Sequence, residues 1–547
     1  MYPLIKYTIK IYLFVLLAFI TVNKALPNGS PVHSFDVLKY ELHFDLYDCF
    51  LKPYTHSFSA SEIISFRVDS ALNSISLNAS THSLIIDSVS FPCKSFEQKN
   101  DLLVINLDRN YSTDEEVSVQ IFFRHKDVID SAFYTGNGLI YTDSETRRAR
   151  LWFPCWDLPS DKALLDLTAK VPLQAMLASN GTLADSTISG DSVYYHWVTE
   201  HPLSTYLMVM VGDVYFKLDV LYANLNGREI PVMFYYKPWD NVDSLRHVEN
   251  AMIPMIEYYS SIFGDYPFSK IGFATTDSLF QWGGMENQTM ITLCPHCWQE
   301  QYVSHEFAHQ WFGDMISPGT WADMWLNEGF ATYIEALWSE HLGGYHAYKS
   351  SVNMFADLYL FYNPGYAIYN PDWVTNIPDD DTLSNFAIPY MKGGCVLHML
   401  RYVLGDSVFF KAIKDYASDD EFKFGNVTTP EFIDKVNQYT GEDLSWFFSE
   451  WLYQPNHPVY RNTYNITGEN NSWTVNLTIK QVQPGMFFKM PVQIMVRYKD
   501  LSDTTFRVDN GTNNQQFSFK FKREPYSLIF DPNNNIVLKD ETTSIKR

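Results

Sequence analysis

The sequence is poor in several features that would point to particular partners. Its 40 lysines and arginines are outnumbered by 63 aspartates and glutamates, and they form no basic run. Nucleic acids are bound mainly through basic surfaces, so we expect no nucleic-acid partner. Only one long apolar run is present, and it is too short to cross a bilayer unaided, so we expect no stable membrane span.

That apolar run extends from Ile11 to Val22, close to the N-terminus and behind two lysines. It is followed by NKALPNGS, which offers a cleavage site near Ala25. A short apolar segment placed between basic and small residues is typical of a secretory signal peptide. We therefore predict a signal peptide over residues 1–25 and a secreted product, extracellular or periplasmic. A retained signal anchor is the alternative.

Cysteine is also scarce, with six residues in a chain of 547. An even number is compatible with disulfides in an oxidising compartment. Cys49 and Cys93 are a candidate pair. Cys294-Pro-His-Cys297 resembles a redox motif, but the sequence pattern around it does not indicate a βαβ unit. We therefore expect a local disulfide or two structural thiols there.

Short alternating runs are abundant in the first part of the chain. Residues 26–216 alternate apolar and polar side chains, as in YELHFDL and VSVQIFF, with turn-rich breaks between the runs. A period of two is typical of strands with one buried face. We predict an N-terminal β-rich domain, a saddle or sandwich of antiparallel strands.

From residue 217 to 453 the pattern becomes mostly helical. After the strand-like stretches REIPVMFYY and KIGFATT come amphipathic runs such as VENAMIPMIEYYSSIF and GCVLHMLRYVLG. Residues 454–540 return to strand-like runs, as in PVQIMVRY and FSFKFKR, which predict a small C-terminal β-sandwich before a tail over 541–547. The chain is thus predicted to be an α+β multidomain protein.

The main chemical signal is the stretch SHEFAHQWFGD, from Ser304 to Asp314. His305 and His309 are four positions apart, so on a helix both imidazoles lie on one face and can hold the same metal ion. Glu306 lies between them and can act as a general base at the open side of that metal. His-Glu-x-x-His on a helix is a signature of zinc metalloproteases.

A further ligand is expected, because catalytic zinc normally takes three protein ligands. Glu328 in WLNEGFA follows His309 at a distance that lets the first helix end in SPGT, 317–320, and a second helix return antiparallel to it. Glu328 is therefore the leading candidate. Glu335 lies on roughly the same helix face, where it is expected to support a ligand or to contact the substrate.

Each of these residue types also has an ordinary structural use. A lone histidine on an apolar helix is usually a packed, hydrogen-bonded core residue, a tyrosine before a helix usually packs, and GGMEN alone would be an ordinary turn. Two histidines that enclose a glutamate are different, because burying so many ionisable groups without a metal or partners costs several kcal/mol. The metal interpretation is therefore favoured.

Four separated stretches together resemble one enzyme family. They are RLWFPCWDLPSDKA (Arg150 to Ala163), GGMEN (Gly283 to Asn287), HEFAHQWFGD with WLNEGFA, and IPYMKGG (Ile388 to Gly394). In order and spacing the chain resembles the gluzincin aminopeptidase family, the group of aminopeptidase N and the leukotriene epoxide hydrolase/aminopeptidase. The resemblance extends from about residue 35 to about residue 455.

The resemblance implies a thermolysin-like catalytic domain and a zinc-dependent aminopeptidase with one Zn2+ per chain. His305, His309 and Glu328 would hold the zinc, Glu306 would be the general base, and Tyr390 of IPYMKGG would stabilise the transition state. The substrates would be peptides with a free N-terminus.

GGMEN would bind the start of the peptide. Its glycines let a strand edge approach an extended chain, and Glu286 can hold a free α-ammonium group. The implied substrate-binding residues are Gly283, Gly284, Met285, Glu286 and Asn287.

Two further acidic positions are candidates for supporting roles. In most relatives a Gln or Glu shortly before RLWFPCWD also helps to hold the amine. The nearest positions here read Thr142-Asp143-Ser144-Glu145, and Asp143 is a weak candidate. Asp314 is expected either to orient a zinc imidazole or to cap the end of the helix.

Other functions are weighed against this one. A catalytically silent binding or adhesion protein would keep the fold, but the implied zinc ligands, the general base and the tyrosine are all intact. Epoxide hydrolysis is the other alternative, since GGMEN and IPY also resemble the leukotriene branch. The predicted leader argues against it, as does a sequence that stops before the large helical C-terminal domain of many relatives.

Overall fold

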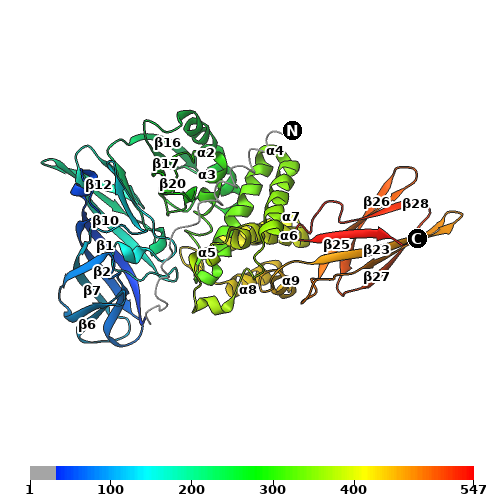
Figure 1. Cartoon of the computed structure of the whole chain (residues 1–547), viewed down its shortest axis with the longest axis horizontal. Helices are drawn as coiled ribbons and strands as arrows, with labels where there is room; N and C mark the ends of the chain where they lie inside the picture. The colour runs from blue at the N-terminus through cyan, green and yellow to red at the C-terminus, as the bar shows by residue number, and fades with distance from the viewer. Residues whose placement is uncertain (1–32, 547) are drawn as a thin grey trace.

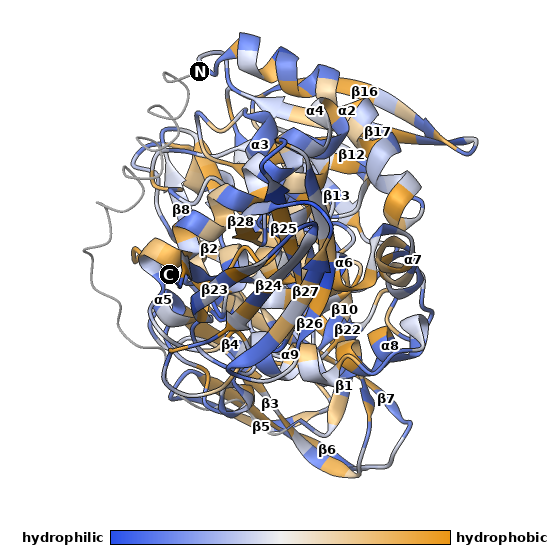
Figure 2. Cartoon of the chain, turned by 90° about the vertical axis from the view of Figure 1, so that its right-hand side faces the viewer, coloured by the Kyte–Doolittle hydropathy of each residue, from blue (hydrophilic) through white to orange (hydrophobic). Residues whose placement is uncertain are grey.

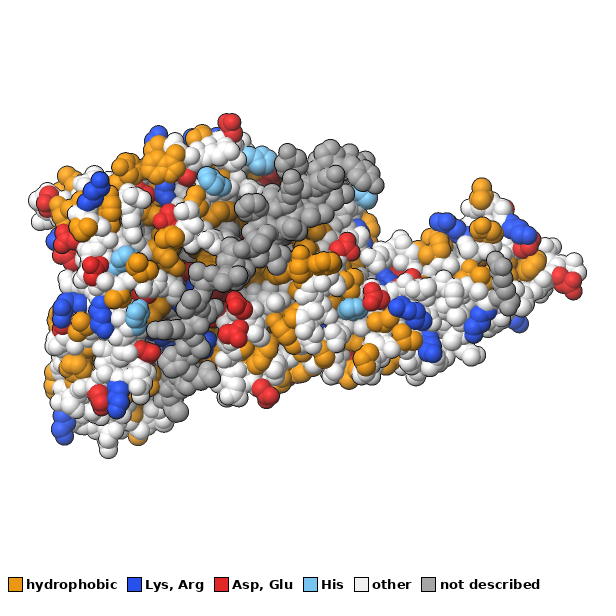
Figure 3. Space-filling view, viewed as in Figure 1, with side chains coloured by type: hydrophobic (Ala, Val, Ile, Leu, Met, Phe, Trp, Pro, Cys, Tyr) orange, Lys and Arg blue, Asp and Glu red, His pale blue; other side chains and the backbone are white. Residues whose placement is uncertain are grey.

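The computed structural model describes residues 33–546, and the predicted signal peptide lies outside them. A β-rich N-terminal part, a mostly helical middle part and a C-terminal pair of sheets follow one another along the long axis of the molecule (Figure 1). The predicted α+β multidomain architecture is confirmed. On the face in Figure 3, the lysines and arginines outside the grey atoms form small separate groups. Among the described residues, no helix has both the length and the apolar character that a membrane crossing requires.

Strand alternation builds the N-terminal domain. Its elements are β1 (Phe35–Asp45), η1 (Tyr47–Phe50), β2 (Phe58–Val68), β3 (Leu72–Asn78), β4 (Leu84–Val89), β5 (Cys93–Lys99), β6 (Leu102–Tyr111), β7 (Glu116–His125), β8 (Phe133–Gly136), β9 (Leu139–Thr142), η2 (Ala149–Leu151), β10 (Lys162–Pro172), β11 (Met176–Ser179), β12 (Thr182–Ser189), β13 (Ser192–Val198), β14 (Leu203–Ser204), η3 (Thr205–Leu207) and β15 (Met210–Asp213). In β7, Val117, Val119 and Ile121 are buried, and the polar residues between them are not. The largest sheet has the order β12-β13-β10-β1-β2-β7-β4, with β14 beside β10. Two smaller sheets, β11-β15-β9-β8 and β3-β6-β5, complete the domain.

The middle domain begins with a sheet of order β16-β17-β18-β20-β19. Its strands are β16 (Lys217–Leu225), β17 (Arg228–Tyr236), β18 (Ile271–Thr275), β19 (Gly284–Met285) and β20 (Ile291–Leu293). β17, β18 and β20 run parallel, and α2 (Val242–Phe263) connects β17 to β18. This βαβ unit ends before the cysteine motif, which lies between β20 and α3 (Glu300–Ala308), and the strand after α3, β21 (Ser317–Pro318), belongs to another sheet. The prediction that the motif is not part of a βαβ unit is confirmed.

Helices form the rest of the middle domain. Its elements are α3 (Glu300–Ala308), β21 (Ser317–Pro318), η4 (Trp321–Asp323), α4 (Trp325–Tyr362), η5 (Pro371–Val374), α5 (Asp380–Leu383), η6 (Phe386–Lys392), α6 (Gly393–Leu404), α7 (Asp406–Ala417), β22 (Asn426–Val427), α8 (Thr429–Thr440) and α9 (Ser445–Trp451). α4 bends at Gly344, whose φ of 70° suits glycine. α6 crosses α4 so closely that a Cβ added to Gly393 would lie 2.9 Å from the Cα of Gly329. This packing brings the IPYMKGG segment against the helix that carries Glu328.

The C-terminal part is a small two-sheet unit. Its strands are β23 (Val459–Glu469), β24 (Ser472–Ile479), β25 (Met490–Tyr498), β26 (Asp503–Asn510), β27 (Gln515–Phe521), β28 (Pro525–Phe530) and β29 (Asp540–Ile545). The sheet orders are β27-β24-β23-β29 and β26-β25-β28, and Figure 2 shows hydrophilic and hydrophobic residues alternating along these strands. The core continues into the middle domain, where Trp451 of α9 packs on Phe488. The expected tail is wrong over 541–545, because these residues belong to β29, which pairs in parallel with β23.

Buried polar contacts fix the N-terminal domain to the middle domain. Nζ of Lys162 donates to the carbonyl oxygens of Asp314 and Met315 at 2.7 and 3.1 Å. Arg148 reaches Asp380 in the same interface, with Nη2 at 3.1 Å from Oδ2. The apolar core of the N-terminal domain includes Met285 of GGMEN. The substrate motif is therefore held between two domains.

One of the two expected cysteine pairs forms a disulfide in the structure, and the other does not. Cys294 and Cys297 form a disulfide, which was one of the alternatives for that motif. Cys49 and Cys93 are both free, so the predicted pair is wrong. Cys49 is buried in η1 with Sγ at 3.5 Å from the carbonyl oxygen of Ser57, whereas Cys93 opens a strand of a separate sheet.

Candidate active site

The two histidines of the signature lie on one face at the end of α3. His305 is inside the helix, and His309 follows its last residue with helical backbone angles (φ −59°, ψ −24°). Their ring centroids are 4.8 Å apart and their planes are nearly perpendicular, at 80°. The i, i+4 spacing therefore places both imidazoles in one pocket, as the sequence predicts.

Both imidazoles point toward the same carboxylate oxygen on α4. Oε2 of Glu328 lies 3.2 Å from Nε2 of His305 and 3.5 Å from Nε2 of His309. Ligand atoms of all three residues lie within 4.8 Å of one another. Glu328 reaches this place differently from expectation: α3 ends at Ala308, and the Ser317–Pro318 pair forms a short strand beside β22.

Hydrogen bonds on the far side of each ring hold this orientation. Nδ1 of His305 lies 2.8 Å from Oε1 of Glu335, and Nδ1 of His309 lies 3.1 Å from the carbonyl oxygen of Phe312. An acceptor at Nδ1 keeps the proton there and leaves the Nε2 lone pair for a metal. Two Nε2 atoms and one carboxylate are a standard zinc set, so the residues present fit the ion that the sequence predicts. Glu335 thus supports His305 by this hydrogen bond, which is one of the two roles expected for it.

Asp314 does not orient a zinc imidazole, and it meets the helix end only through its main-chain N–H, which donates to the carbonyl oxygen of His309 at 2.9 Å. Both carboxylate oxygens are buried and have no hydrogen-bond partner among the described residues. The imidazole of His309 uses the Phe312 carbonyl instead, and the helix has already ended at Ala308. The main-chain oxygen of Asp314 receives the Lys162 contact described above.

Glu306 faces the strand that carries GGMEN. A Cβ added at Gly284 would lie 2.4 Å from Cγ and Oε1 of Glu306, so the backbone of β19 passes directly over this carboxylate. Burial raises the pKa of Glu306 to about 8. A carboxyl group in this range can both accept and return a proton near neutral pH.

Glu286 brings another carboxylate to the same pocket. Ligand atoms of Glu286, Glu306 and His309 lie within 4.8 Å of one another. This set also has three donor residues, but we assign the metal to the first set because both Nε2 atoms converge on Glu328 there. Oε1 of Glu286 accepts from Nδ2 of Asn327 at 2.9 Å. This hydrogen bond ties the carboxylate to α4, the helix that also carries Glu328.

The other members of GGMEN serve mainly to hold the strand. Gly283 has a φ of 95°, which glycine adopts without strain. The side chain of Met285 is buried in the N-terminal core, and Oδ1 of Asn287 accepts from Thr292 at 3.0 Å. These side chains are engaged by the protein, so Glu286 is the member whose side chain faces the metal ligands.

Tyr390 lies beside the metal ligands, in the π-helical turn η6. Its ring is nearly parallel to that of His305, at 12°, with the centroids 6.1 Å apart. π-Helical turns are rare in proteins, and those that occur often lie at functional sites. Burial raises the pKa of Tyr390 well above its usual range, so the hydroxyl stays protonated and can donate.

Asp143, the candidate from the sequence, and its neighbour Glu145 differ in how their carboxylates are engaged. Asp143 is engaged by Arg148 at 3.3 Å and by the indole N–H of Trp282 at 3.1 Å. Oε1 of Glu145 is buried and has no hydrogen-bond partner within residues 33–546. Burial raises the pKa of Glu145, and the charges of Glu286 and Glu328 add to this rise. TDSETRR contains both acids, and only the fold of the loop selects between them.

Two stretches of the chain match domains of one peptidase family. Residues 38–207 match the Peptidase M1 N-terminal domain, and residues 247–451 match the Peptidase family M1 domain. Together they span more than half of the chain. The chain belongs to the peptidase M1 family. The family resemblance predicted from the four motifs is thus confirmed.

Curated relatives of this M1 family member are named aminopeptidases. "Probable aminopeptidase 1" of Sulfurisphaera tokodaii is 25% identical over 80% of this chain and 58% of its own length. "Aminopeptidase N" of Lactococcus lactis is 29% identical over 60% of this chain and 41% of its own length. The chain thus spans about half the length of the curated relatives it matches.

Solved structures share the fold of this M1 family member. An M1 zinc metallopeptidase from Deinococcus radiodurans aligns with a TM-score of 0.68 at 23% identity, over 77% of this chain and 95% of that one. Legionella pneumophila aminopeptidase A, in complex with aspartic acid, aligns with a TM-score of 0.76 at 18% identity, over 94% of this chain and 60% of that one. These likenesses establish the three-part fold.

Proposed function

We propose that this M1 family member is a zinc aminopeptidase that releases single residues from the N-terminus of peptides. The observation that carries the proposal is the position of Glu286, whose carboxylate lies within 4.8 Å of ligand atoms of Glu306 and His309. A carboxylate so close to the metal ligands would hold the positively charged chain end so that the carbonyl of the same, first residue reaches the metal.

Glu286 and Glu145 are the residues that would hold the α-ammonium group. Both are in the pocket beside Glu328, and burial strengthens their interaction with a cation. The exposed edge of β19 would accept the peptide backbone by strand addition, with Gly284 allowing close approach. A peptide bound in this way presents only its first peptide bond to the metal.

His305, His309 and Glu328 would hold the zinc, which when bound supplies a Lewis acid that polarises the scissile carbonyl and makes water more acidic. Glu306 takes the proton of the attacking water and returns it to the leaving amine. Tyr390 donates a hydrogen bond to the oxygen on which negative charge develops. Glu335 keeps the ring of His305 in the orientation that the ion requires.

Glu286→Gln tests the role of the carboxylate with paired substrates. Each peptide is assayed with a free and with an acetylated N-terminus, in zinc-saturated enzyme. We expect kcat/KM for the free peptide to fall about 100-fold, on the order of the cost of removing one partner of a buried ion pair, and the value for the acetylated peptide to change little. Equal losses for both peptides would contradict the ammonium contact.

Asp143→Asn is the matched control, because it neutralises a second buried acid in the loop of Glu145. Asp143 is engaged by Arg148 and Trp282, so the ratio between free and acetylated peptides should stay at the wild-type value. A fall in this ratio would assign the amine contact to Asp143.

The same assays separate the alternative functions. A binding or adhesion protein would hold stoichiometric zinc without turnover of any aminoacyl substrate. An epoxide hydrolase would open an allylic epoxide and leave peptides intact. A panel of all twenty aminoacyl fluorophores identifies the preferred first residue of an aminopeptidase.

We also propose that the mature protein is secreted, with one zinc ion per chain and peptides as its partners. The N-terminal segment supports this location by its pattern, and a disulfide between Cys294 and Cys297 is compatible with an oxidising compartment. N-terminal sequencing of the protein recovered outside the producing cells should begin near Ala25. Zinc analysis of that material should give one equivalent.

A further inference from the structure

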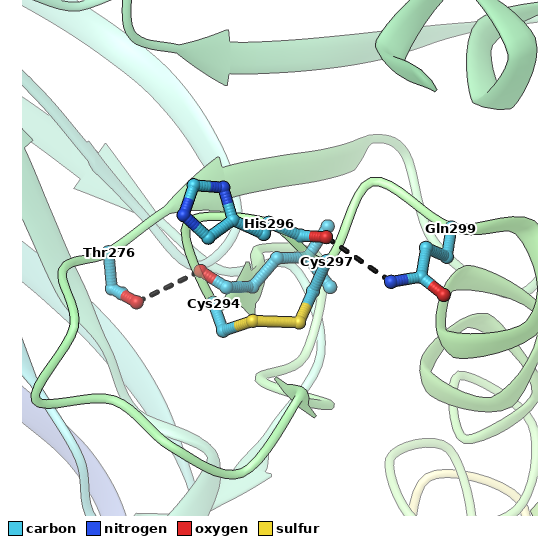
Figure 4. Close-up of a disulfide and its surroundings, with 6 residues drawn as sticks. Thr276, Cys294, His296, Cys297 and Gln299 are labelled. Carbon is cyan, nitrogen blue, oxygen red and sulfur yellow. Dashed lines mark hydrogen bonds between the residues drawn. A yellow bond between two sulfur atoms is a disulfide. The ribbon is translucent and has the colours of Figure 1, made fainter. Parts of the chain in front are cut away.

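The Cys294–Cys297 disulfide lies between β20, which pairs with the GGMEN strand β19, and α3, the helix that carries His305. Cys294 follows β20 directly, and Cys297 lies just before α3, as Figure 4 shows. The N–H of Cys294 donates to the carbonyl oxygen of Gly283 at 3.0 Å and extends the pairing of β20 with β19. The disulfide therefore closes the turn between the strand that positions GGMEN and the helix that carries His305.

The two cysteines of the disulfide differ in exposure. Cys294 is partly exposed and is followed by Pro295 and the exposed His296, whereas Cys297 is only 5% exposed. A reaction partner can therefore approach Cys294 and not Cys297. In Figure 4 the side chain of Gln299 donates to the carbonyl oxygen of His296 at 3.3 Å, on the helix side of the turn.

Stability alone does not account for this bond. A disulfide between residues three positions apart removes little loop-closure entropy from the unfolded chain. By contrast, a Cys-x-x-Cys pair placed after a parallel strand and before a helix is the setting of thiol–disulfide exchange motifs. Here β20, which runs parallel to β18, ends directly before Cys294, and α3 begins shortly after Cys297.

We propose that Cys294–Cys297 is a thiol–disulfide exchange site that accepts electrons from a dithiol reductant. Reduction frees the end of β20 from the start of α3 and weakens substrate binding at GGMEN. The second statement depends on the proposed aminopeptidase function, while the exchange site itself does not.

The exchange proceeds in two balanced steps. A thiolate of the dithiol attacks Sγ of Cys294, which forms an intermolecular disulfide and releases the Cys297 thiolate. The second thiol of the reductant, as its thiolate, then attacks the reductant's own sulfur in that bond and releases the Cys294 thiolate. The reductant departs with an internal disulfide. Two electrons and two protons have passed to the protein, and both cysteines end as thiols.

The remaining cysteines provide internal references for labelling. Cys49, Cys155 and Cys395 are buried, and burial raises the pKa of each thiol above its usual value. They should resist a thiol-specific alkylating reagent as long as the protein stays folded. Cys93 is partly exposed and should be labelled before and after reduction.

The first experiment measures reduction in the folded, zinc-loaded protein. The protein is equilibrated with graded ratios of reduced and oxidised dithiothreitol, quenched in acid, alkylated, and analysed by peptide mass spectrometry. We expect Cys294 and Cys297 to become labelled together while the three buried cysteines stay unlabelled. Labelling of the pair only under conditions that also label the buried cysteines would overturn the proposal.

Two single variants test which sulfur exchanges. Cys297→Ser leaves the accessible Cys294 thiol and should form a mixed disulfide with oxidised glutathione at that residue. Cys294→Ser leaves the buried Cys297 thiol and should react at least about tenfold more slowly, as expected for an inaccessible thiol. Equal reaction of the two variants would contradict the assigned direction of attack.

The activity measurement uses the Cys294→Ser/Cys297→Ser double variant as a control for metal loss, since dithiothreitol also binds zinc. Reduction of the wild type should raise KM for a free-amine peptide about threefold to tenfold, on the order of one lost main-chain hydrogen bond, and the untreated double variant should already show this value. Dithiothreitol should then change neither KM nor zinc content of the double variant. A wild-type KM unaffected by complete, specific reduction would refute the coupling and leave the labelling result intact.

Discussion

Replacing Glu335 tests how the imidazole of His305 is held. Oε1 of Glu335 lies 2.8 Å from Nδ1 of His305, and Oε2 accepts from Gln301 at 3.1 Å. In Glu335→Ala the Nδ1–H loses its charged acceptor, so the ring turns more freely and its Nε2 becomes a weaker donor to the metal. Losing a partner of this kind lowers metal affinity about 10- to 100-fold, or about 1.4–2.8 kcal/mol.

Two further variants show whether the effect comes from this contact. Glu335→Gln keeps an oxygen acceptor without the charge, so its zinc affinity should fall between wild type and Glu335→Ala. Glu300→Ala removes another carboxylate from the same region, one that accepts from Nε1 of Trp338 at 2.6 Å and does not touch the ring of His305. Its zinc affinity should stay within about twofold of wild type, as expected for an acid outside the ligand shell.

The measurement is a zinc titration against a chromophoric chelator at fixed pH, followed by kinetics at saturating zinc. If Glu335 acts by positioning, excess zinc should restore most of the lost activity of Glu335→Ala. Zinc should also raise the Tm of each variant, and more for a variant that binds zinc more tightly. A zinc Kd of Glu335→Ala equal to that of Glu300→Ala would show that the ring of His305 is held by something else.

Three other changes have separate expected outcomes. Glu306→Gln should keep zinc and lower kcat by at least about 100-fold, because only the proton-transfer group is lost; loss of zinc would reassign Glu306 to the metal. Glu328→Ala should lower zinc affinity by more than Glu335→Ala does, and an unchanged occupancy would remove Glu328 from the ligands. Burial raises the pKa of Glu450 to about 8 from an ordinary value near 4.5, so the folded state keeps a proton that the unfolded state releases, and stability should fall as pH rises from about 4.5 to about 8. Glu450→Gln should remove about 1–3 kcal/mol of that fall in urea denaturation at pH 5 and pH 9; parallel pH profiles would mean that Glu450 is ionised in the folded protein.

The metal ligands could be predicted because their geometry is local. The spacing of His305 and His309 fixes their common direction on any helix, whatever the rest of the chain does. Glu328 was the leading candidate from its distance to His309, and the family motif added to this, since the approach of Glu328 depends on how α4 returns. The turn expected between the helices at 317–320 was misplaced, because those residues are drawn into a strand pair with the distant β22.

Contacts between distant segments could not be predicted. The choice between Asp143 and Glu145 depends on a loop whose path is set by Arg148 and its contact with Asp380 in another domain. Whether Cys49 and Cys93 form a disulfide depends on the distance between them in the fold, which their spacing in the sequence does not give. β29 is short and polar and becomes a strand only because β23 offers it an edge.

The site contains more negative charge than its two imidazoles can balance. Burial raises the pKa of both Glu145 and Glu286, and nearby carboxylates raise each further. Buried like charges are costly unless cations neutralise them. In the proposed reaction, a zinc ion beside Glu328 would supply two positive charges and the ammonium group at Glu286 a third. A peptide with a blocked N-terminus brings no positive charge, yet it removes water from these carboxylates. Its affinity is therefore lowered twice, by the missing attraction and by the uncompensated cost of desolvation. Selectivity for a free amine therefore follows from the same excess of carboxylates that favours the metal.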